Sequence, residues 1–127
     1  MEEVRALIVD DSSVMRKIVE RSLRQAGLDS LVVVEAASGA EGLEALKRGP
    51  VDLILSDINM PVMDGLEFLR QIQAQKLAEG VPVVMITTES SAEHVKQAIE
   101  AGARGYIRKP FTADQVKERV LPLVKAA

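Results

Sequence analysis

One aspartate stands where the sequence changes from a buried strand to a loop. Asp57 follows the apolar run 51–55, which only Asp52 interrupts, and the Pro- and Gly-containing loop 59–65 comes directly after it. In an open α/β sheet, ligands bind outside the carboxyl ends of the strands. The Asp57 carboxylate is therefore a candidate for chemistry. An aspartate at such a position also commonly starts a turn or caps a helix, so the interpretation depends on which residues converge on it.

Four more polar residues stand at the ends of predicted strands. They are Asp10, Asp11, Thr87 and Lys109. Each has an ordinary interpretation, since either acid can cap the next helix, Thr87 can be a strand residue and Lys109 a solvated surface charge. In a parallel sheet, however, all these strand ends lie along one edge of the molecule. Their coincidence with Asp57 favours a shared site.

If the first and third strands are neighbours, Asp10, Asp11 and Asp57 bring three carboxylates into one concavity. Two unit charges ~4 Å apart repel by roughly 4 kcal/mol at an effective dielectric constant of about 20. A hard divalent cation removes this repulsion, and Mg2+ prefers oxygen ligands such as carboxylates, water and phosphate. The single histidine, His94, and the lack of cysteine disfavour metals that need nitrogen or sulfur ligands.

This set of side chains suits phosphoryl transfer. The Asp57 carboxylate can attack phosphorus and form an acyl phosphate, as carboxylates do in covalent catalysis. A metal ion and the Lys109 ammonium would then neutralise the equatorial phosphoryl oxygens, and the Thr87 hydroxyl would donate a hydrogen bond to one of them. The residues therefore indicate a phosphoacceptor aspartate with catalytic support from Lys109 and Thr87.

The elements that must position these residues alternate between strand and helix. Apolar and β-branched runs predict strands at 4–9, 31–35, 52–56, 81–87 and 105–108. Helical spacing and capping residues predict helices at 12–26, 38–49, 64 onward, 90–101 and 112 onward. The alternation predicts an α/β fold, a five-stranded parallel sheet with helices on both faces. The pattern leaves the strand orders 3-2-1-4-5 and 2-1-3-4-5 open, and Pro122 predicts a kink or early fraying of the last helix.

The composition bounds the class of protein. A chain of 127 residues, 47% hydrophobic and 28% charged, is typical of one globular domain, and we expect a single domain over 1–127. Apolar runs are of strand length, and the acidic start of the sequence does not resemble a secretory signal, so we expect a cytoplasmic protein without a membrane partner. A net charge of -3 with interspersed signs argues against direct nucleic-acid binding.

Four motifs extend the interpretation from the residues to a family. They are Leu7 to Ser12, Asp57 to Gly65, Ile86-Thr87, and Tyr106 to Phe111. Together they resemble the receiver domains of two-component response regulators, and the chain looks most like the stand-alone CheY-like type. The resemblance spans essentially the whole chain. It implies the flavodoxin-like strand order 2-1-3-4-5, for which CheY is a standard example.

The resemblance also implies roles for the strand-end residues. Asp57 is the residue that a partner histidine kinase phosphorylates. Asp10, Asp11, Asp57 and the backbone carbonyl of Asn59 resemble the family's Mg2+ positions, with Mn2+ as an alternative ion. Lys109 resembles the lysine that contacts the phosphoryl group. The Lys109-Pro110 bond is cis in such domains, and X-Pro bonds tolerate cis at modest cost.

Further residues resemble the family's switch and output positions. Thr87 and Tyr106 match the switch pair, in which the hydroxyl moves toward the phosphate and the ring rotates inward. The face of helix four, strand five and helix five then changes shape. Our candidates for this face are Ser91, Val95, Ala103, Tyr106, Arg108 and Arg119.

Three positions are expected to set the rate of self-dephosphorylation. Asn59 and Glu89 match the CheY-like pattern at the positions that tune this rate. Thr88 departs from the family, which usually has a very small residue after the switch threonine. We expect its branched side chain to narrow the path of water or phosphodonor.

The expected function is a phosphorylation-operated switch without an output domain, catalysing only its own phosphorylation and dephosphorylation. Such a chain docks on a downstream protein, relays its phosphoryl group, or acts as a phosphate sink for a kinase. The Asn59 and Glu89 pattern favours chemotaxis, and we expect a monomer or weak dimer.

Two rival classes fit the sequence less well. A haloacid-dehalogenase-like phosphatase also uses an Asp nucleophile with Mg2+, but such enzymes have a second Asp where this chain has Asn59, whose amide cannot act as an acid. A flavodoxin-like cofactor binder needs a phosphate loop after the first strand, and Asp10 and Asp11 there would repel the phosphate.

Overall fold

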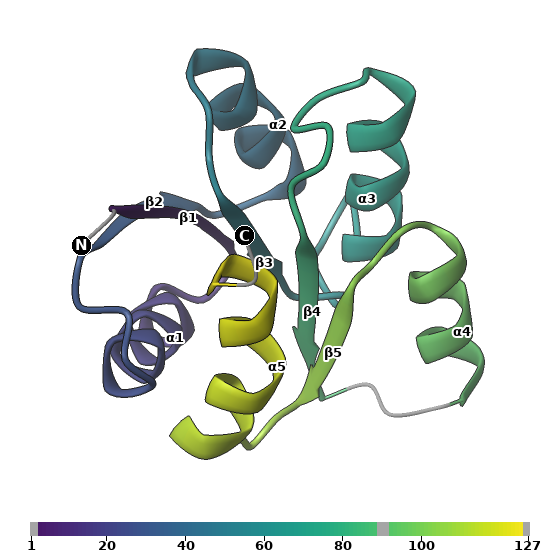
Figure 1. Ribbon diagram of the computed structural model, residues 1–127. Coiled ribbons are helices and arrows are strands. Elements are labelled where there is room, and N and C mark those ends of the chain that lie inside the picture. Colours follow the sequence, from purple (N-terminus) through teal and green to yellow (C-terminus); the bar gives the residue numbers. More distant parts are fainter. Residues whose placement is uncertain (1–2, 89–91, 126–127) are drawn as a thin grey trace.

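Five parallel strands form one sheet in the order β2-β1-β3-β4-β5 (Figure 1). The strands are β1 Val4–Val9, β2 Leu31–Ala36, β3 Leu53–Ser56, β4 Val83–Thr87 and β5 Gly105–Arg108. The computed structural model describes residues 3–88 and 92–125. The α/β fold with the order 2-1-3-4-5 is thus confirmed. This order makes β1 and β3 neighbours, which is the arrangement that the candidate site requires.

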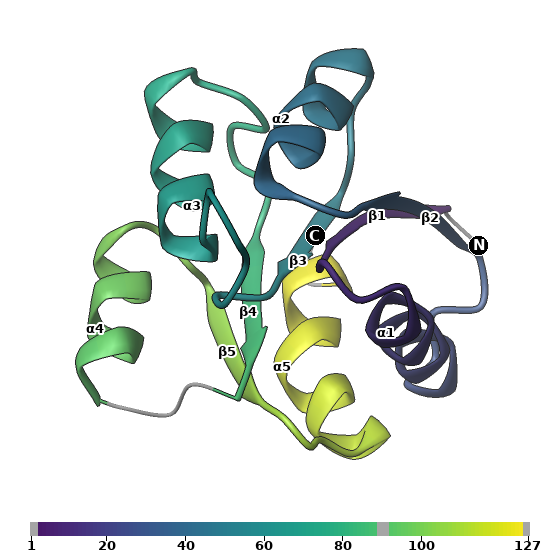
Figure 2. The same ribbon diagram turned by 180° about the vertical axis from the view of Figure 1, so that it is seen from behind.

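Helices cover both faces of the sheet. They are α1 Ser13–Gln25, α2 Gly39–Arg48, α3 Gly65–Ala74, α4 Ala92–Glu100 and α5 Ala113–Lys125. The pair α1 and α5 lies on one face, and α2, α3 and α4 lie on the other (Figures 1 and 2). Because both faces are covered, every side chain of β3 and β4 is buried. The two resulting apolar layers hold the strand ends rigidly.

Short polar side chains begin the helices as the sequence predicts. The Ser38 hydroxyl accepts the backbone N–H of Glu41 at 3.1 Å. Thr112 and Gln115 form a reciprocal cap, with bonds of 2.9 and 3.2 Å. The first helix is capped by Ser12, whose hydroxyl accepts the backbone N–H of Met15. The capping alternative for the acids before it is therefore wrong, and their carboxylates are available to the site.

Two predictions at prolines differ from the structure. The strand predicted from Val81 begins at Val83 instead, because Pro82 has no backbone N–H to give to the ladder. For Pro122 the prediction was a kink or early fraying of the last helix. The helix continues through Pro122 to Lys125, so the early fraying does not occur, and the kink stays a prediction. Pro122 lies in the final turn, where its ring removes one hydrogen bond. The predicted cap at 90–91 lies outside the described residues.

No helix within residues 3–88 and 92–125 has the length and apolar character needed to cross a bilayer.

Candidate functional site

The register of β1 and β3 places two of the acids side by side. Val9 pairs with Ser56 in the parallel ladder. The backbone N–H of Asp57 donates to the Val9 carbonyl at 3.0 Å, so Asp10 and Asp57 begin neighbouring loops at the same edge of the sheet. The acids lie 47 positions apart in the sequence, and a hydrogen bond of the sheet brings them together. The predicted convergence of these strand ends is confirmed.

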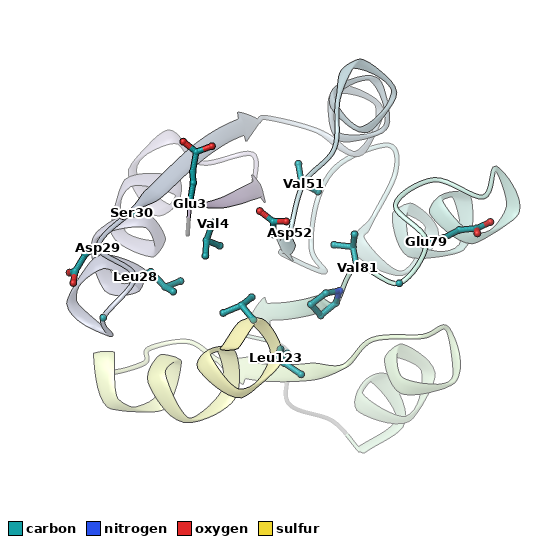
Figure 3. Close-up of a pocket in the computed structure, with 14 residues that line it drawn as sticks. Glu3, Val4, Leu28, Asp29, Ser30, Val51, Asp52, Glu79, Val81 and Leu123 are labelled. Carbon is teal, nitrogen blue, oxygen red and sulfur yellow. The ribbon is translucent and has the colours of Figure 1, made fainter. Parts of the chain in front are cut away.

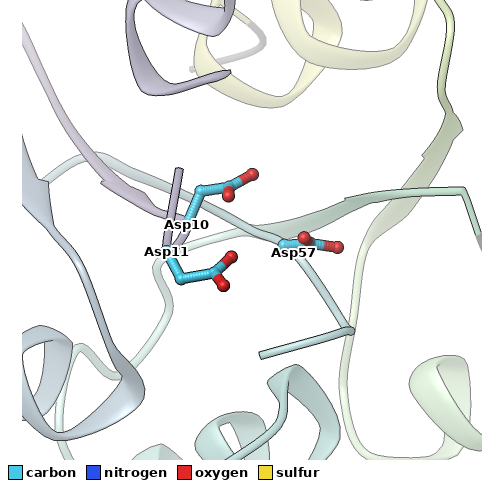
Figure 4. A group of neighbouring side chains, drawn as sticks. All are labelled: Asp10, Asp11 and Asp57. Atoms are coloured by element: carbon cyan, nitrogen blue, oxygen red, sulfur yellow. The ribbon is translucent and has the colours of Figure 1, made fainter. Parts of the chain in front are cut away.

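Asp10, Asp11 and Asp57 form a compact acidic cluster (Figure 4). Each offers a carboxylate oxygen, and these oxygens lie within 4.8 Å of one another. In an octahedral site with metal–oxygen distances of about 2.1 Å, ligand oxygens stand roughly 3 to 4.2 Å apart. Asp10 and Asp57 are buried, whereas Asp11 is exposed. The oxygen donors, their spacing and one solvent-facing side therefore fit a hard divalent cation that keeps some of its water.

Lys109 supplies the positive charge at this cluster. Its ammonium lies 3.0 Å from one oxygen of Asp10 and 3.4 Å from one oxygen of Asp57, and its side chain is largely buried. The backbone N–H of Lys109 donates to the Thr87 carbonyl at 2.8 Å, and the Lys109-Pro110 peptide bond is cis, as the family resemblance implies. Three carboxylates beside one ammonium leave two negative charges, which a divalent cation would balance.

Backbone amides orient the two buried carboxylates. The second oxygen of Asp10 accepts the N–H of Ser12 at 2.9 Å, and the second oxygen of Asp57 accepts the N–H of Asn59 at 3.2 Å. Each carboxylate is thus held between an amide and Lys109. The Asp57 side chain keeps 10% of its surface exposed, so its carboxylate is fixed in direction and still open to a small reactant.

Thr87 is connected to the cluster through Asn59. The Asn59 side-chain amide donates to the Thr87 hydroxyl at 3.3 Å, and Thr87 is fully buried. Tyr106 pairs with Met85 across β4 and β5 and packs against the same apolar layer as Met85. Since side chains alternate along a strand, Tyr106 and Thr87 lie on the same face of the sheet. The structure therefore places the predicted switch residues on one face of the sheet, and Asn59 links Thr87 to the loop of Asp57.

The residues predicted for the docking face differ in how exposed they are. Val95 is half-buried, and Arg108 and Arg119 are exposed, as a docking face requires. Ala103 is 8% exposed and packs in the apolar layer with α3 and α4, so its assignment to the docking face is corrected. Its small side chain fills a gap in the core and offers little surface to a partner.

Three predicted residues concern turnover or the start of α4. Thr88 is exposed directly after β4, and its predicted effect on turnover stays a prediction. Glu89 and Ser91 lie outside the described residues.

The sequence interpretation missed two residues that support the site. Gly65 begins α3, and a Cβ there would overlap the carbonyl oxygen of Asp57. Arg16 donates to the backbone carbonyl of Asp10 at 2.6 Å. A glycine directly after the helix-capping Asp64 was a visible signal for close backbone approach. No local pattern distinguishes Arg16 from the other basic residues of α1.

A cavity of about 690 Å³ lies at the opposite end of the sheet (Figure 3). Its lining includes the starts of β1 and β3, with Val4, Val51 and Asp52, and the end of α5, with Leu123. None of the residues of the acidic cluster lines it. The acidic cluster and this cavity therefore lie at opposite ends of the sheet.

Comparison with known proteins agrees with this geometry. The sequence matches the family model of the response regulator receiver domain over residues 6–121. It is similar to the chemotaxis protein CheY-3 of Vibrio cholerae serotype O1, with 43% identity over 117 residues, which are 92% of this chain and 88% of the relative. It is also similar to a chemotaxis protein CheY homolog of Campylobacter jejuni, with 41% identity over 118 residues, covering 92% and 89%. The solved structure of Vibrio cholerae CheY4 matches with a TM-score of 0.85 and 34% identity, covering 96% of this chain and 99% of that one.

Proposed function

Because this chain belongs to the family of response regulator receiver domains, we propose that it is a phosphorylation-activated switch of a two-component pathway in which Asp57 accepts the phosphoryl group. One observation carries the assignment of the residue. Asp10 and Asp57 both contact Lys109 and both accept a backbone N–H, but Asp57 is the more open of the two, with 10% of its side chain exposed against 6% for Asp10. The family supplies the donor class, a phosphohistidine on a histidine kinase.

In the transfer step, a carboxylate oxygen of Asp57 forms a bond to phosphorus while the phosphorus–nitrogen bond of the donor histidine breaks. The electron pair of the broken bond stays on the donor imidazole, which takes up a proton. The Lys109 ammonium lies 3.4 Å from an Asp57 carboxylate oxygen. It would stabilise the negative charge of the phosphoryl oxygens once phosphorus is bound to Asp57. Bound Mg2+ would neutralise the charge of the phosphoryl oxygens and of the acids. Asp10, Asp11, Asp57 and the Asn59 carbonyl are the residues that would hold it, and Mn2+ has the same oxygen preference.

The signal passes through Thr87 and Tyr106. A phosphoryl group on Asp57 offers new acceptor oxygens to the Thr87 hydroxyl, which Asn59 already connects to the loop of Asp57. Movement of Thr87 changes the space beside Tyr106 on the same face of the sheet. The surface formed by the half-buried Tyr106 and Val95 and the exposed Arg108 and Arg119 then presents a different shape to a protein partner.

The pathway we favour is chemotaxis. Its support is that relatives with 43% and 41% identity carry the name of chemotaxis proteins. In this proposal the chain is a signalling switch that acts by binding a downstream protein. Its catalysis is limited to its own phosphorylation and dephosphorylation.

Phosphorylation by a small donor tests the assignment directly. Incubation with acetyl phosphate and Mg2+ should add one phosphoryl group, measured by intact-protein mass spectrometry, and Asp57→Asn should abolish the addition. Asp64→Asn is the matched control, because Asp64 belongs to the same loop but only caps α3, a role that asparagine fills equally well. Unchanged mass of the parent, or full modification of Asp57→Asn, would contradict the proposal.

A further inference from the structure

Arg16 joins two strand ends beside the acidic cluster. Its Nη1 donates to the carbonyl oxygen of Asp10 at 2.6 Å, and its Nε donates to a carboxylate oxygen of Glu35 at 2.9 Å. Glu35 belongs to β2, and its other oxygen accepts a hydrogen bond from Lys17 at 3.1 Å. The Arg16 side chain is only 15% exposed. A planar guanidinium that is held at two points has one orientation, so it can hold its partner peptide in one orientation too.

The peptide that Arg16 contacts is the one between Asp10 and Asp11. The other polar groups of Asp10 are occupied: its N–H donates to the Ala36 carbonyl, and its two carboxylate oxygens accept from Ser12 and Lys109. The Asp10 side chain is therefore fixed without Arg16. The exposed Asp11 side chain takes its position from its backbone, and the Asp10 carbonyl belongs to the peptide plane that sets this backbone direction.

We infer that Arg16, held by Glu35, is a positioning residue that aims the Asp11 carboxylate at the metal site. This inference rests on the proposed function, because it concerns affinity for the cation that the proposed chemistry needs. Arg16 contacts the Asp10 carbonyl and Glu35, so its influence on a bound cation would pass through the peptide between Asp10 and Asp11. Its effect is to hold the Asp11 carboxylate, one of the three acidic ligands, in position before the cation binds. Cation binding then does not carry the entropic cost of ordering the backbone at Asp11.

Simple electrostatics predicts the opposite effect. A positive charge beside the acidic cluster repels a divalent cation, so removal of the Arg16 charge alone would strengthen Mg2+ binding. Loss of the contact that positions Asp11 would instead weaken Mg2+ binding. The sign of the change in affinity therefore distinguishes the two roles of the same side chain.

The test is calorimetric titration of the unphosphorylated protein with MgCl2. We expect Arg16→Gln to bind Mg2+ roughly tenfold more weakly than the parent, a typical effect of removing a residue that orients a metal ligand. Arg16→Lys keeps the positive charge but lacks the planar guanidinium that donates to Asp10 and Glu35 together, so it should also bind Mg2+ more weakly than the parent. Arg24→Gln is the matched control, because Arg24 lies on the same helix, forms a similar pair with Glu20 and does not touch Asp10. Equal or tighter binding by both Arg16 variants would overturn the inference.

A second measurement separates positioning from a general loss of structure. The Mg2+ concentration that half-saturates phosphorylation by acetyl phosphate should rise for Arg16→Lys, while the rate at saturating Mg2+ returns to that of the parent. A rate that stays low at saturating Mg2+ would contradict positioning. If the parent itself binds no Mg2+, the proposed metal site fails. If the parent binds and the variants bind equally well, only the role of Arg16 fails.

Discussion

At Gly65 the start of α3 lies against the backbone of residues 57–58, and its substitution by alanine should be costly. A Cβ at this position would overlap the carbonyl oxygen of Asp57 and would lie 2.7 Å from the Cα of Ile58 and 2.8 Å from the Cε of Met85. Carbon atoms in contact prefer about 3.5 to 4 Å. The flexible end of the Met85 side chain can move, but the other two neighbours are backbone atoms of Asp57 and Ile58.

The expected destabilisation follows from these contacts. Overpacking costs about 1–3 kcal/mol when side chains can adjust, and a backbone shift puts Gly65→Ala at or above the upper end of that range. Alanine regains up to about 1 kcal/mol of helix propensity at the start of α3. We expect a net loss of about 2–3 kcal/mol in the free energy of unfolding, which for a chain of this size is a decrease in Tm of roughly 6–12 °C.

Urea unfolding followed by circular dichroism measures this loss, and acetyl phosphate labelling measures its effect on Asp57. Both stability and the rate of labelling should fall, because the loop that carries Asp57 must move. Gly49→Ala is the matched control. Gly49 has extended backbone and no atom within 4 Å of an added Cβ, so its stability should change by less than about 0.5 kcal/mol. A Gly65→Ala protein as stable as the parent would refute the reasoning.

Two further substitutions test the charges around the site. Asp11→Asn should weaken Mg2+ binding at least several-fold in calorimetry, because it removes one carboxylate of the acidic cluster. The metal-free variant should be at least as stable as the metal-free parent, because Ser12 and not Asp11 caps α1. Clear destabilisation of the metal-free protein would indicate a structural role for Asp11. Glu35→Gln tests acid stability. Hydrogen bonds from Arg16 and then Lys17 lower the pKa of Glu35 from 4.5, so the ion pair stabilises the protein above that pH and is lost as pH falls through the lowered pKa. Between about pH 5 and pH 3 the parent should therefore lose more stability than Glu35→Gln in urea titrations; parallel curves would contradict this.

Local features of the fold were predictable because they depend on nearby residues. The caps at Ser38 and Thr112 join groups three residues apart, and the sequence spacing shows both partners. Buried strands were recognisable as short apolar runs. The start of β4 at Val83 was missed although Pro82, which has no backbone N–H, marks it locally. Whether α5 would end early at Pro122 was left open, because that depends on the packing of the helix against the sheet.

The candidate site was predictable only as a set of strand ends. Asp10, Asp57 and Lys109 were identifiable from their positions, and the family motifs supplied the strand order that the residue pattern left open. Ala103 shows the opposite case. It was a candidate for the output face that the family resemblance implies, but its burial depends on the packing of α3 and α4.

Short-range spacing was enough to identify the types and the chain positions of the reactive groups, the alternation of strands and helices, and most helix starts. The tertiary structure alone decided which groups touch. Lys109 reaches Asp10 across 99 positions, and Arg16 reaches Glu35 across 19. Such contacts depend on strand order and register, and the pairing of Val9 with Ser56 arises from packing of the whole sheet, which no local pattern encodes.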